Sequence, residues 1–225
     1  MNIVIKKTNR KKTISIQVKN GLIDVRVPQH IAQVEIDSFI QKKMPWIKKK
    51  VDIQNKIITP KRKKFLNNES FLFMGKEFKL NIVVLKNKKN YIDDSTIQIV
   101  IKEKDINNKP KVKIALEKIY RKYALQILAE KTMLIASNIN VEPGKIRVRS
   151  YKGRWGTCSY KKDISFNWKL IMAPEKIIEY VIVHELCHLI HFNHSKNFWE
   201  SVENILPDYK LRKDWLRTNE GLLDW

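Results

Sequence analysis

The sequence predicts an α+β fold, because strand-like and helix-like patterns occupy separate stretches of the chain. Alternating apolar and polar residues recur in the first hundred residues, and longer helical patterns dominate the rest. With 225 residues, 43% of them hydrophobic, the chain can bury a substantial core. We expect a basic, antiparallel β-rich module with one helical region at 1–105 and a second domain at 106–225.

The chain is expected to open with a β-hairpin. Apolar residues alternate in 14–18 and again in 23–27, and the Asn20-Gly21 pair between them favours a two-residue hairpin turn. Residues 33–55 then follow a helical pattern, which Pro45 should bend or break.

The basic run 61–64 is predicted to be a surface linker that leads to more strands. Residues 71–80 resemble a second hairpin, and 95–102 alternate like another strand. These segments complete the β-rich module.

The second domain is expected to begin with a long helix at 110–138. Strands at 146–149 and 164–168 follow, joined by a turn region at 154–159. Pro174 then opens another helix, since proline suits a helix's first turn.

This last helix contains the motif His184-Glu185-Leu186-Cys187-His188. Residues four apart lie about 6 Å apart along a helix and on one side of it, so His184 and His188 can bind one metal ion. Glu185 lies beside them and suits a general base. A catalytic zinc ion has three protein ligands and one open position, so the motif predicts a zinc hydrolase site that needs a third ligand. Two core histidines in a buried helix are the alternative interpretation.

His194 is the preferred third ligand, and it requires the helix to end near Phe192 so that the chain can turn back. Asn193 tolerates the left-handed conformation that ends helices, and Ser195 could cap a following helix. His191 would lie too far along a continuing helix to share the ion. The alternatives are a carboxylate from Glu200 or Glu203, or the Cys158 thiolate.

An ordered set of motifs over residues 145–218 resembles the YgjP-like metallopeptidase family and, more distantly, the SprT-like zinc proteases. Weaker likeness reaches the amino-terminal part and includes Trp46-Ile47. The motifs are Arg154-Trp155-Gly156-Thr157-Cys158-Ser159, Ile164-Ser165-Phe166-Asn167-Trp168, the segment at 184–188, Asn193-His194-Ser195 and Phe198-Trp199.

The resemblance implies a zincin-like core of the gluzincin type, with a catalytic domain at 106–225. It places His184, His188 and His194 on Zn²⁺ and makes Glu185 the catalytic acid. Thr157, where the family more often has Ser, and Cys187, where it often has Ala, are mild departures that remove no ligand.

Four further residues are candidates for contacts with the substrate or transition state. Arg154 or a backbone group near Gly156 could stabilise an oxyanion. Because zincins bind extended peptides on an exposed edge strand, we expect the strand at 164–168 to play that role, with Phe166 and Asn167 near the substrate. Packing in the core is the alternative for Phe166.

The net charge of +22, from 45 Lys and Arg against 23 Asp and Glu, suggests a polyanionic partner. The basic runs are Lys48-Lys49-Lys50 and Lys61-Arg62-Lys63-Lys64. They predict sequence-independent nucleic-acid binding, and a generally lysine-rich surface is the alternative.

No apolar run is long enough for a signal peptide or a membrane span, so we expect a soluble cytoplasmic protein without a membrane partner. The two cysteines are then expected to be reduced thiols.

Three functions fit the sequence. The first is a zinc-dependent metallopeptidase that acts on proteins or peptides and is recruited to nucleic acid by its basic region. The second is a metal-dependent nucleotide phosphohydrolase of the pyrophosphatase type, and the third is a nucleic-acid-binding protein with structural zinc.

Overall fold

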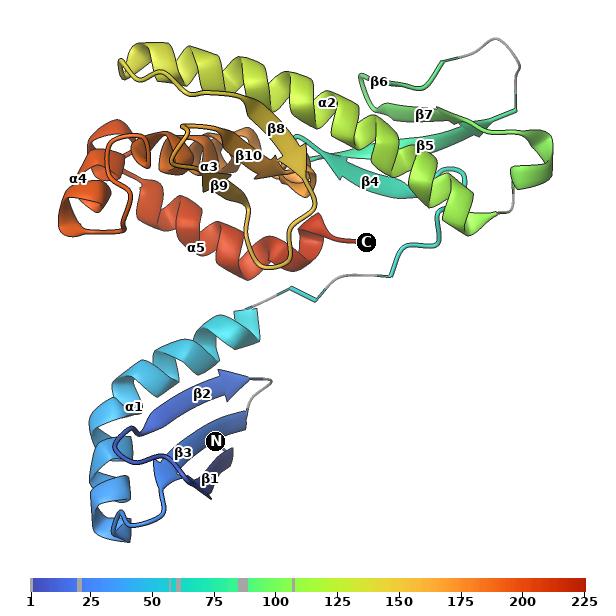
Figure 1. Cartoon of the computed structure of the whole chain (residues 1–225). Helices are drawn as coiled ribbons and strands as arrows, with labels where there is room; N and C mark the ends of the chain where they lie inside the picture. The colour runs from blue at the N-terminus through green and yellow to red at the C-terminus, as the bar shows by residue number, and fades with distance from the viewer. Residues whose placement is uncertain (1, 20–21, 57, 60–61, 85–88, 107) are drawn as a thin grey trace. The chain divides into compact units, whose positions relative to one another are not determined.

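The computed structural model describes residues 2–19, 22–56, 58–59, 62–84, 89–106 and 108–225. It is a mixed α+β structure, which confirms the predicted class. The chain divides into two compact units, Met1–Ile58 and Thr59–Trp225 (Figure 1). The structural boundary therefore falls well before the predicted one after residue 105.

The amino-terminal unit is a three-stranded sheet packed on one helix. Strand order is β1-β3-β2, for β1 (Asn2–Thr8), β2 (Ser15–Lys19) and β3 (Leu22–Pro28). The predicted antiparallel pairing of β2 with β3 is confirmed, whereas Asn20-Gly21 lies outside the described residues. Strand β1 is parallel to β3 and was not predicted, because it is an edge strand whose side chains are mostly exposed and show no buried alternation.

Helix α1 (Gln33–Lys56) runs through Pro45 without a break. Figure 1 shows its axis changing direction partway along, as expected where a proline removes a backbone N–H. The helix buries Ile36, Ile40 and Ile47 against the sheet. Because residues on both sides of Pro45 pack against the same sheet, the helix continues through the proline. The predicted bend therefore occurs and the predicted break does not.

A four-stranded sheet begins the larger unit. Its order is β4-β5-β7-β6, for β4 (Ser70–Phe73), β5 (Lys76–Val83), β6 (Tyr91–Asp93) and β7 (Thr96–Val100). The β4–β5 hairpin is confirmed, with positive φ at both turn residues, Met74 and Gly75. Strands β5 and β7 are parallel, however, so the sheet is mixed rather than antiparallel.

The remaining elements surround a second sheet of order β8-β10-β9. Helix α2 extends along the whole unit and contacts both β7 and β8 (Figure 1). The strands are β8 (Ile146–Arg149), β9 (Gly156–Cys158) and β10 (Ile164–Asn167), the helices are α2 (Lys109–Asn138), α3 (Glu175–Cys187), α4 (Lys196–Ile205) and α5 (Tyr209–Asn219), and the short 3₁₀ helices are η1 (Glu103–Asp105), η2 (Trp168–Met172) and η3 (Glu220–Leu223).

Direct contacts explain why residues 70–100 belong with this unit. The Tyr120 hydroxyl on α2 donates to the Leu72 carbonyl on β4 at 2.7 Å. The β4–β5 turn lies against the start of α3, where a Cβ at Gly75 would be 2.7 Å from the Cα of Pro174. One hydrophobic core thus includes the strands and the helices, and no boundary separates them at residue 105. None of the helices in the described part of the chain combines the length and apolar character that crossing a bilayer requires.

Candidate metal centre and active site

Helix α3 places the motif histidines on a buried scaffold. Pro174 is its N-cap residue, as the sequence indicated, and its side chains are buried on nearly all sides. The helix ends at Cys187, earlier than the predicted end near Phe192, and His188 is the C-cap residue. Asn193 does not adopt the expected left-handed conformation; its Oδ1 accepts a hydrogen bond from the Ser195 amide at 3.3 Å.

Three histidines converge where the chain turns back. The candidate ligand atoms of His184, His188 and His194 lie within 4.8 Å of one another. The Nε2 atoms of His184 and His194 are 3.0 Å apart. Two nitrogens at tetrahedral positions around one zinc ion would be about 3.3 Å apart, so the cluster fits such an ion with little movement. These three residues can bind a metal ion.

The protonation of the cluster also suits a metal. The Nδ1 atom of His188 donates to the His191 carbonyl at 2.9 Å if it carries the proton, which leaves Nε2 of His188 free for an ion. Burial, with the nearby His188 and His194, lowers the pKa of His184 to about 3. The His184 ring is therefore neutral, which is the form that binds metals.

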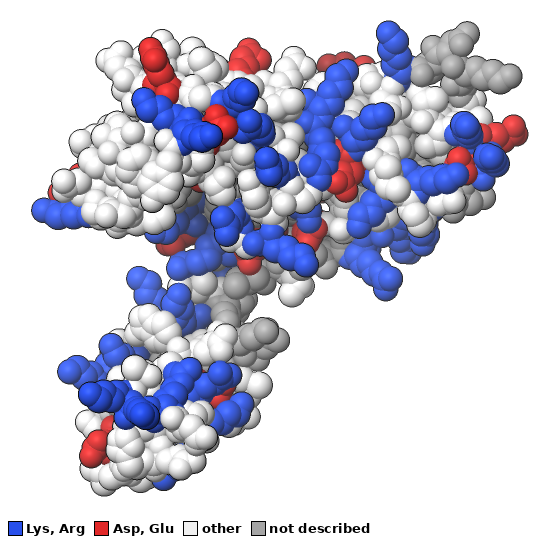
Figure 2. Space-filling view, viewed as in Figure 1, with Lys and Arg blue, Asp and Glu red and all other residues white. Residues whose placement is uncertain are grey.

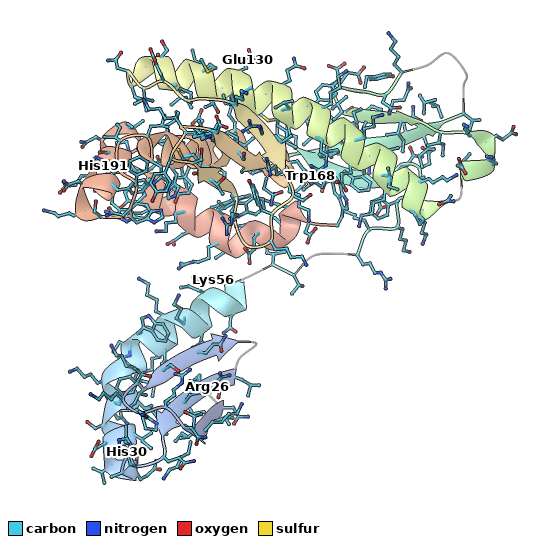
Figure 3. All side chains as sticks on the ribbon, in the orientation of Figure 1. Arg26, His30, Lys56, Glu130, Trp168 and His191 are labelled. Atoms are coloured by element: carbon cyan, nitrogen blue, oxygen red, sulfur yellow. The ribbon has the colours of Figure 1, made fainter. Side chains whose placement is uncertain are left out.

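His191 flanks the cluster rather than joining it, as predicted. Its Nε2 lies 3.1 Å from the Ser201 hydroxyl on α4. Figure 3 shows it beside the carboxyl-terminal helices, whereas His30, the fifth histidine, belongs to the amino-terminal unit.

Aromatic rings hold the loop that carries His194. The Trp199 ring stacks on His194 with centroids 5.6 Å apart, and Tyr209 stacks on Trp199 at 5.4 Å. Phe198, fully buried, packs against His188 at 4.5 Å. The Ser195 hydroxyl caps α4 by accepting from the Phe198 amide at 3.4 Å, so the predicted cap is confirmed.

The side chain of Glu185, on α3, lies against strand β9, and only 4% of the residue's surface is exposed. A Cβ at Gly156 would be 2.6 Å from the Cγ of Glu185, so only glycine leaves room for this carboxylate. Burial raises the pKa of Glu185 to about 8, and the positive charge of Arg154 acts in the opposite direction. The environment thus favours a carboxylate that can take up a proton near neutral pH.

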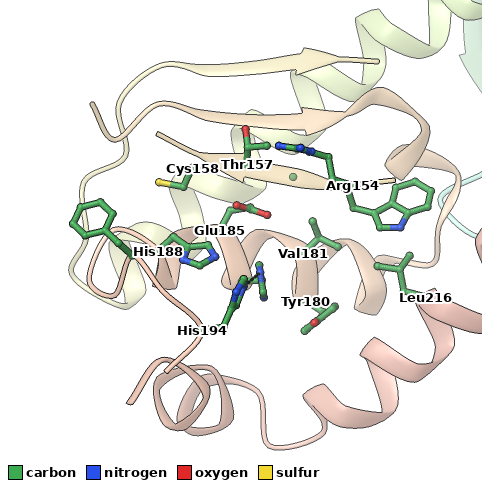
Figure 4. A pocket seen from close by; sticks show the side chains of 13 residues that line it. Arg154, Thr157, Cys158, Tyr180, Val181, Glu185, His188, His194 and Leu216 are labelled. Carbon is green, nitrogen blue, oxygen red and sulfur yellow. Dashed lines mark hydrogen bonds between the residues drawn. The ribbon is translucent and has the colours of Figure 1, made fainter. Parts of the chain in front are cut away.

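A cavity of about 440 Å³ opens over the histidines and Glu185 (Figure 4). Arg154 and Gly156 line it, as the sequence suggested. The other lining residues come from β9 and its flanks, α3, the loop after α3, and α5; they are Trp155, Thr157, Cys158, Tyr180, Val181, Phe192 and Leu216. Sequence reasoning missed Tyr180 and Val181 as site residues, because their apolar pattern indicated only the core.

The structure corrects the predicted substrate strand. Strand β10 is the central strand of its sheet, between β8 and β9, so it offers no free edge. Phe166 is fully buried, and Asn167 is buried with its Nδ2 donating to the carbonyls of Tyr151 and Arg154. The edge strand beside the cavity is β9, within the segment predicted to be a turn. A strand of three residues is too short for its alternation of side chains to be recognised in the sequence.

The alternative ligands lie outside the cluster. Among the described residues, the histidine triad forms the group that could hold a metal, and Cys158 does not belong to it. Glu200 pairs with Lys196, and Glu203 pairs with Lys210. Burial raises the pKa of the Cys158 thiol to about 11, which disfavours the thiolate that a metal needs.

The two basic runs fall in different units. Lys48 and Lys49 are exposed on α1, and Lys50 lies with its Nζ 5.6 Å from the centre of the Trp46 ring. In the larger unit, Lys63 donates to the Ser70 carbonyl and lies over the Phe71 ring, so this part of the predicted linker is packed. Arg62 and Lys64 are exposed, and Lys61 lies outside the described residues. Figure 2 shows Lys and Arg side chains spread over both units.

Comparison with known proteins agrees with the site. A family model described as the YgjP-like metallopeptidase domain matches residues 12–219. The protein is thus a metallopeptidase by class. In particular, the chain belongs to the YgjP-like family, which confirms the predicted resemblance.

Two solved structures are also similar to the chain. One is the metallopeptidase zymogen abylysin of Pyrococcus abyssi, with 25% identity and a TM-score of 0.38, covering 40% of this chain and 92% of that one. The other is the metallopeptidase zymogen jannalysin of Methanocaldococcus jannaschii, with 22% identity and a TM-score of 0.35, covering 40% and 91%. The search of curated proteins found no match.

Proposed function

We propose that the protein is a zinc-dependent metallopeptidase with a zincin-like core of the gluzincin type. The observation that supports this best is the convergence of His184, His188 and His194 beside the buried carboxylate of Glu185. All four residues line one cavity.

In this proposal the three histidines hold Zn²⁺. When bound, the ion lowers the pKa of a water molecule and polarises a carbonyl group. Glu185 takes a proton from the attacking water and returns it to the leaving amine. Arg154, which lines the cavity, stabilises the developing negative charge on the carbonyl oxygen.

The open edge of β9 provides a place for an extended peptide. Asn167 donates to the Trp155 carbonyl at 2.8 Å, and Ser159 donates to the Asp163 carbonyl at 2.9 Å. Because residues in an antiparallel pair alternate, Gly156 and Cys158 direct their backbone groups away from β10. Both residues line the cavity, so a substrate paired with them passes Glu185 and the histidines. This arrangement favours a peptide over a nucleotide.

Replacing Glu185 by Gln tests the function. The variant should retain stoichiometric zinc and lose hydrolysis of an unfolded protein. The His184→Ala variant should lose zinc and, with it, hydrolysis of the unfolded protein. The parent protein should not cleave nucleoside triphosphates. Cleavage of triphosphates without cleavage of proteins would support the phosphohydrolase instead.

We also propose that the amino-terminal unit binds nucleic acid and thereby recruits the protein to it. Residues 1–58 contain 13 Lys and Arg against four Asp and Glu, a net charge of +9. The Trp46 ring, 43% exposed, offers a surface on which bases can stack beside Lys43 and Lys50. In the full chain, Lys48→Glu with Lys49→Glu should weaken binding of single-stranded DNA and reduce its salt dependence, whereas Lys102→Glu with Lys104→Glu should change it little.

A further inference from the structure

Two exposed aromatic rings lie together at one end of the cavity. Tyr160, 87% exposed, belongs to the turn between β9 and β10, and Phe192, 61% exposed, belongs to the loop between α3 and α4. Their ring centroids are 5.1 Å apart, with 34° between the ring planes. Phe192 also lines the cavity. Large apolar side chains that meet in solvent beside a site commonly mark a binding surface.

Both rings are carried by well-anchored turns. The Lys162 amide donates to the Ser159 carbonyl at 2.8 Å, which closes the turn that carries Tyr160. On the other side, the His191 amide donates to the Cys187 carbonyl at 2.9 Å, and the His191 ring contacts Ser201. The backbone that carries each ring is therefore held in position before any ligand arrives, which reduces the entropic cost of binding.

The pair of rings lies close after the open strand β9 in the chain, because Tyr160 belongs to the turn that follows this strand. Tyr160 follows Cys158 by two residues. Cys158 lines the cavity, and its backbone groups are directed away from β10. Gly156 lies against Glu185, and Tyr160 follows Gly156 by four residues. Since an extended chain advances about 3.3 Å per residue, a peptide paired with β9 reaches the rings within about four residues of Glu185.

From this geometry we propose that Tyr160 and Phe192 form a subsite for a large apolar or aromatic side chain of the substrate, close to the scissile bond. The inference rests on the proposed peptidase function and names its specificity. Covering two exposed rings with an apolar side chain removes apolar surface from water, and aromatic contacts add to this gain. A peptide with a small residue at that position leaves the rings exposed.

Peptide binding to the Glu185→Gln protein tests the subsite without turnover. The probes are alanine-based peptides that differ only by one Phe, moved along successive positions. One position should give binding about tenfold tighter than the all-alanine peptide. Tyr160→Ser or Phe192→Ser should remove this preference, while Ile114→Ser, which removes an equally exposed apolar side chain from α2, should retain it.

Cleavage-site mapping on a peptide library then separates the subsite from the peptidase function. The parent protein should enrich large apolar residues at the same position, and both serine variants should lose the enrichment. Phe-dependent binding without any cleavage would refute the peptidase and leave the subsite intact. A preference unchanged in the serine variants, or concentration-dependent dimerisation that Tyr160→Ser abolishes, would overturn the subsite.

Discussion

The backbone of Gly156 lies directly against the carboxylate of Glu185, so that a Cβ on this residue would be only 2.6 Å from the Cγ and 2.7 Å from the Cδ of the glutamate. Strand β9 and helix α3 therefore approach each other at a point where no side chain can stand between them. The closeness of these two residues sets the position of the proposed catalytic carboxylate relative to the strand that we propose binds substrate.

Gly156→Ala should impair activity much more than stability. The added methyl group pushes the Glu185 side chain away, and a displacement near 1 Å costs about 100-fold in kcat/KM. Zinc content should remain unchanged, because the three atoms nearest to the added methyl group all belong to Glu185 and not to a histidine. Thr157→Ser, on the same strand, is the matched control. Full activity of Gly156→Ala would show that the position of Glu185 does not matter.

Trp199→Leu should weaken metal binding. The indole ring stacks on His194 and is itself covered by Tyr209, so its loss frees the loop that presents His194. Loss of such a supporting contact typically costs about 10–100-fold in metal affinity. Competition with a chelator measures the effect, and Trp46→Leu in the amino-terminal unit is the control. Equal affinities in the two variants would contradict a positioning role for Trp199.

Asp163→Asn should lower stability at neutral pH but not in acid. The hydrogen bond from Arg147, followed by that from the Lys145 amide, holds the pKa of Asp163 below its usual value. A group with a depressed folded-state pKa stabilises the fold above its unfolded pKa, near 4, and this contribution is lost as the pH falls through the folded value.

The melting temperature, measured from pH 7 down to pH 2, reports this linkage. The difference between the parent protein and Asp163→Asn should shrink as the pH falls below about 4. Glu130→Gln, an exposed carboxylate on α2, is the control and should show a smaller effect. A difference that stays constant with pH would exclude the ion pair as its cause.

Trp225→Ala should destabilise the larger unit by about 3 kcal/mol, in the range for removing a large aromatic side chain from a packed cluster. The centroid of the Trp225 ring lies 4.9 Å from that of Tyr120 on α2 and 5.4 Å from that of Phe71 on β4. Trp225 therefore joins elements that are distant in sequence. Denaturant unfolding measures the loss, with Leu222→Ala, which is partly exposed, as the comparison. Equal losses for the two variants would argue against this joining role.

Much of the local structure was predictable from the sequence. The long helix α2, the β2–β3 and β4–β5 pairings, the Pro174 start of α3 and the Ser195 cap all depend on residues close together in the chain. The approach of His194 to His184 was predicted as the preferred arrangement, because a catalytic zinc ion needs a third ligand and His194 could supply it if the chain turned back after the helix. These features follow from short-range sterics, periodicity and hydrogen bonding, which a sequence expresses directly.

The identity of the open strand and the division of the chain depended on tertiary structure. Strand β10 looked like an edge strand until β8 and β9 paired with both of its sides, and β9 is too short to show a pattern. Likewise, residues 70–100 resembled part of a separate module until their side chains entered the core of α2 and α3. The alternation of apolar residues shows which face of a strand is buried. The strands that pair with it come from distant parts of the chain, so the local sequence does not identify them. The sequence by itself therefore determined which residues we propose for the chemistry, and only long-range packing decided which strand edge lies open beside them.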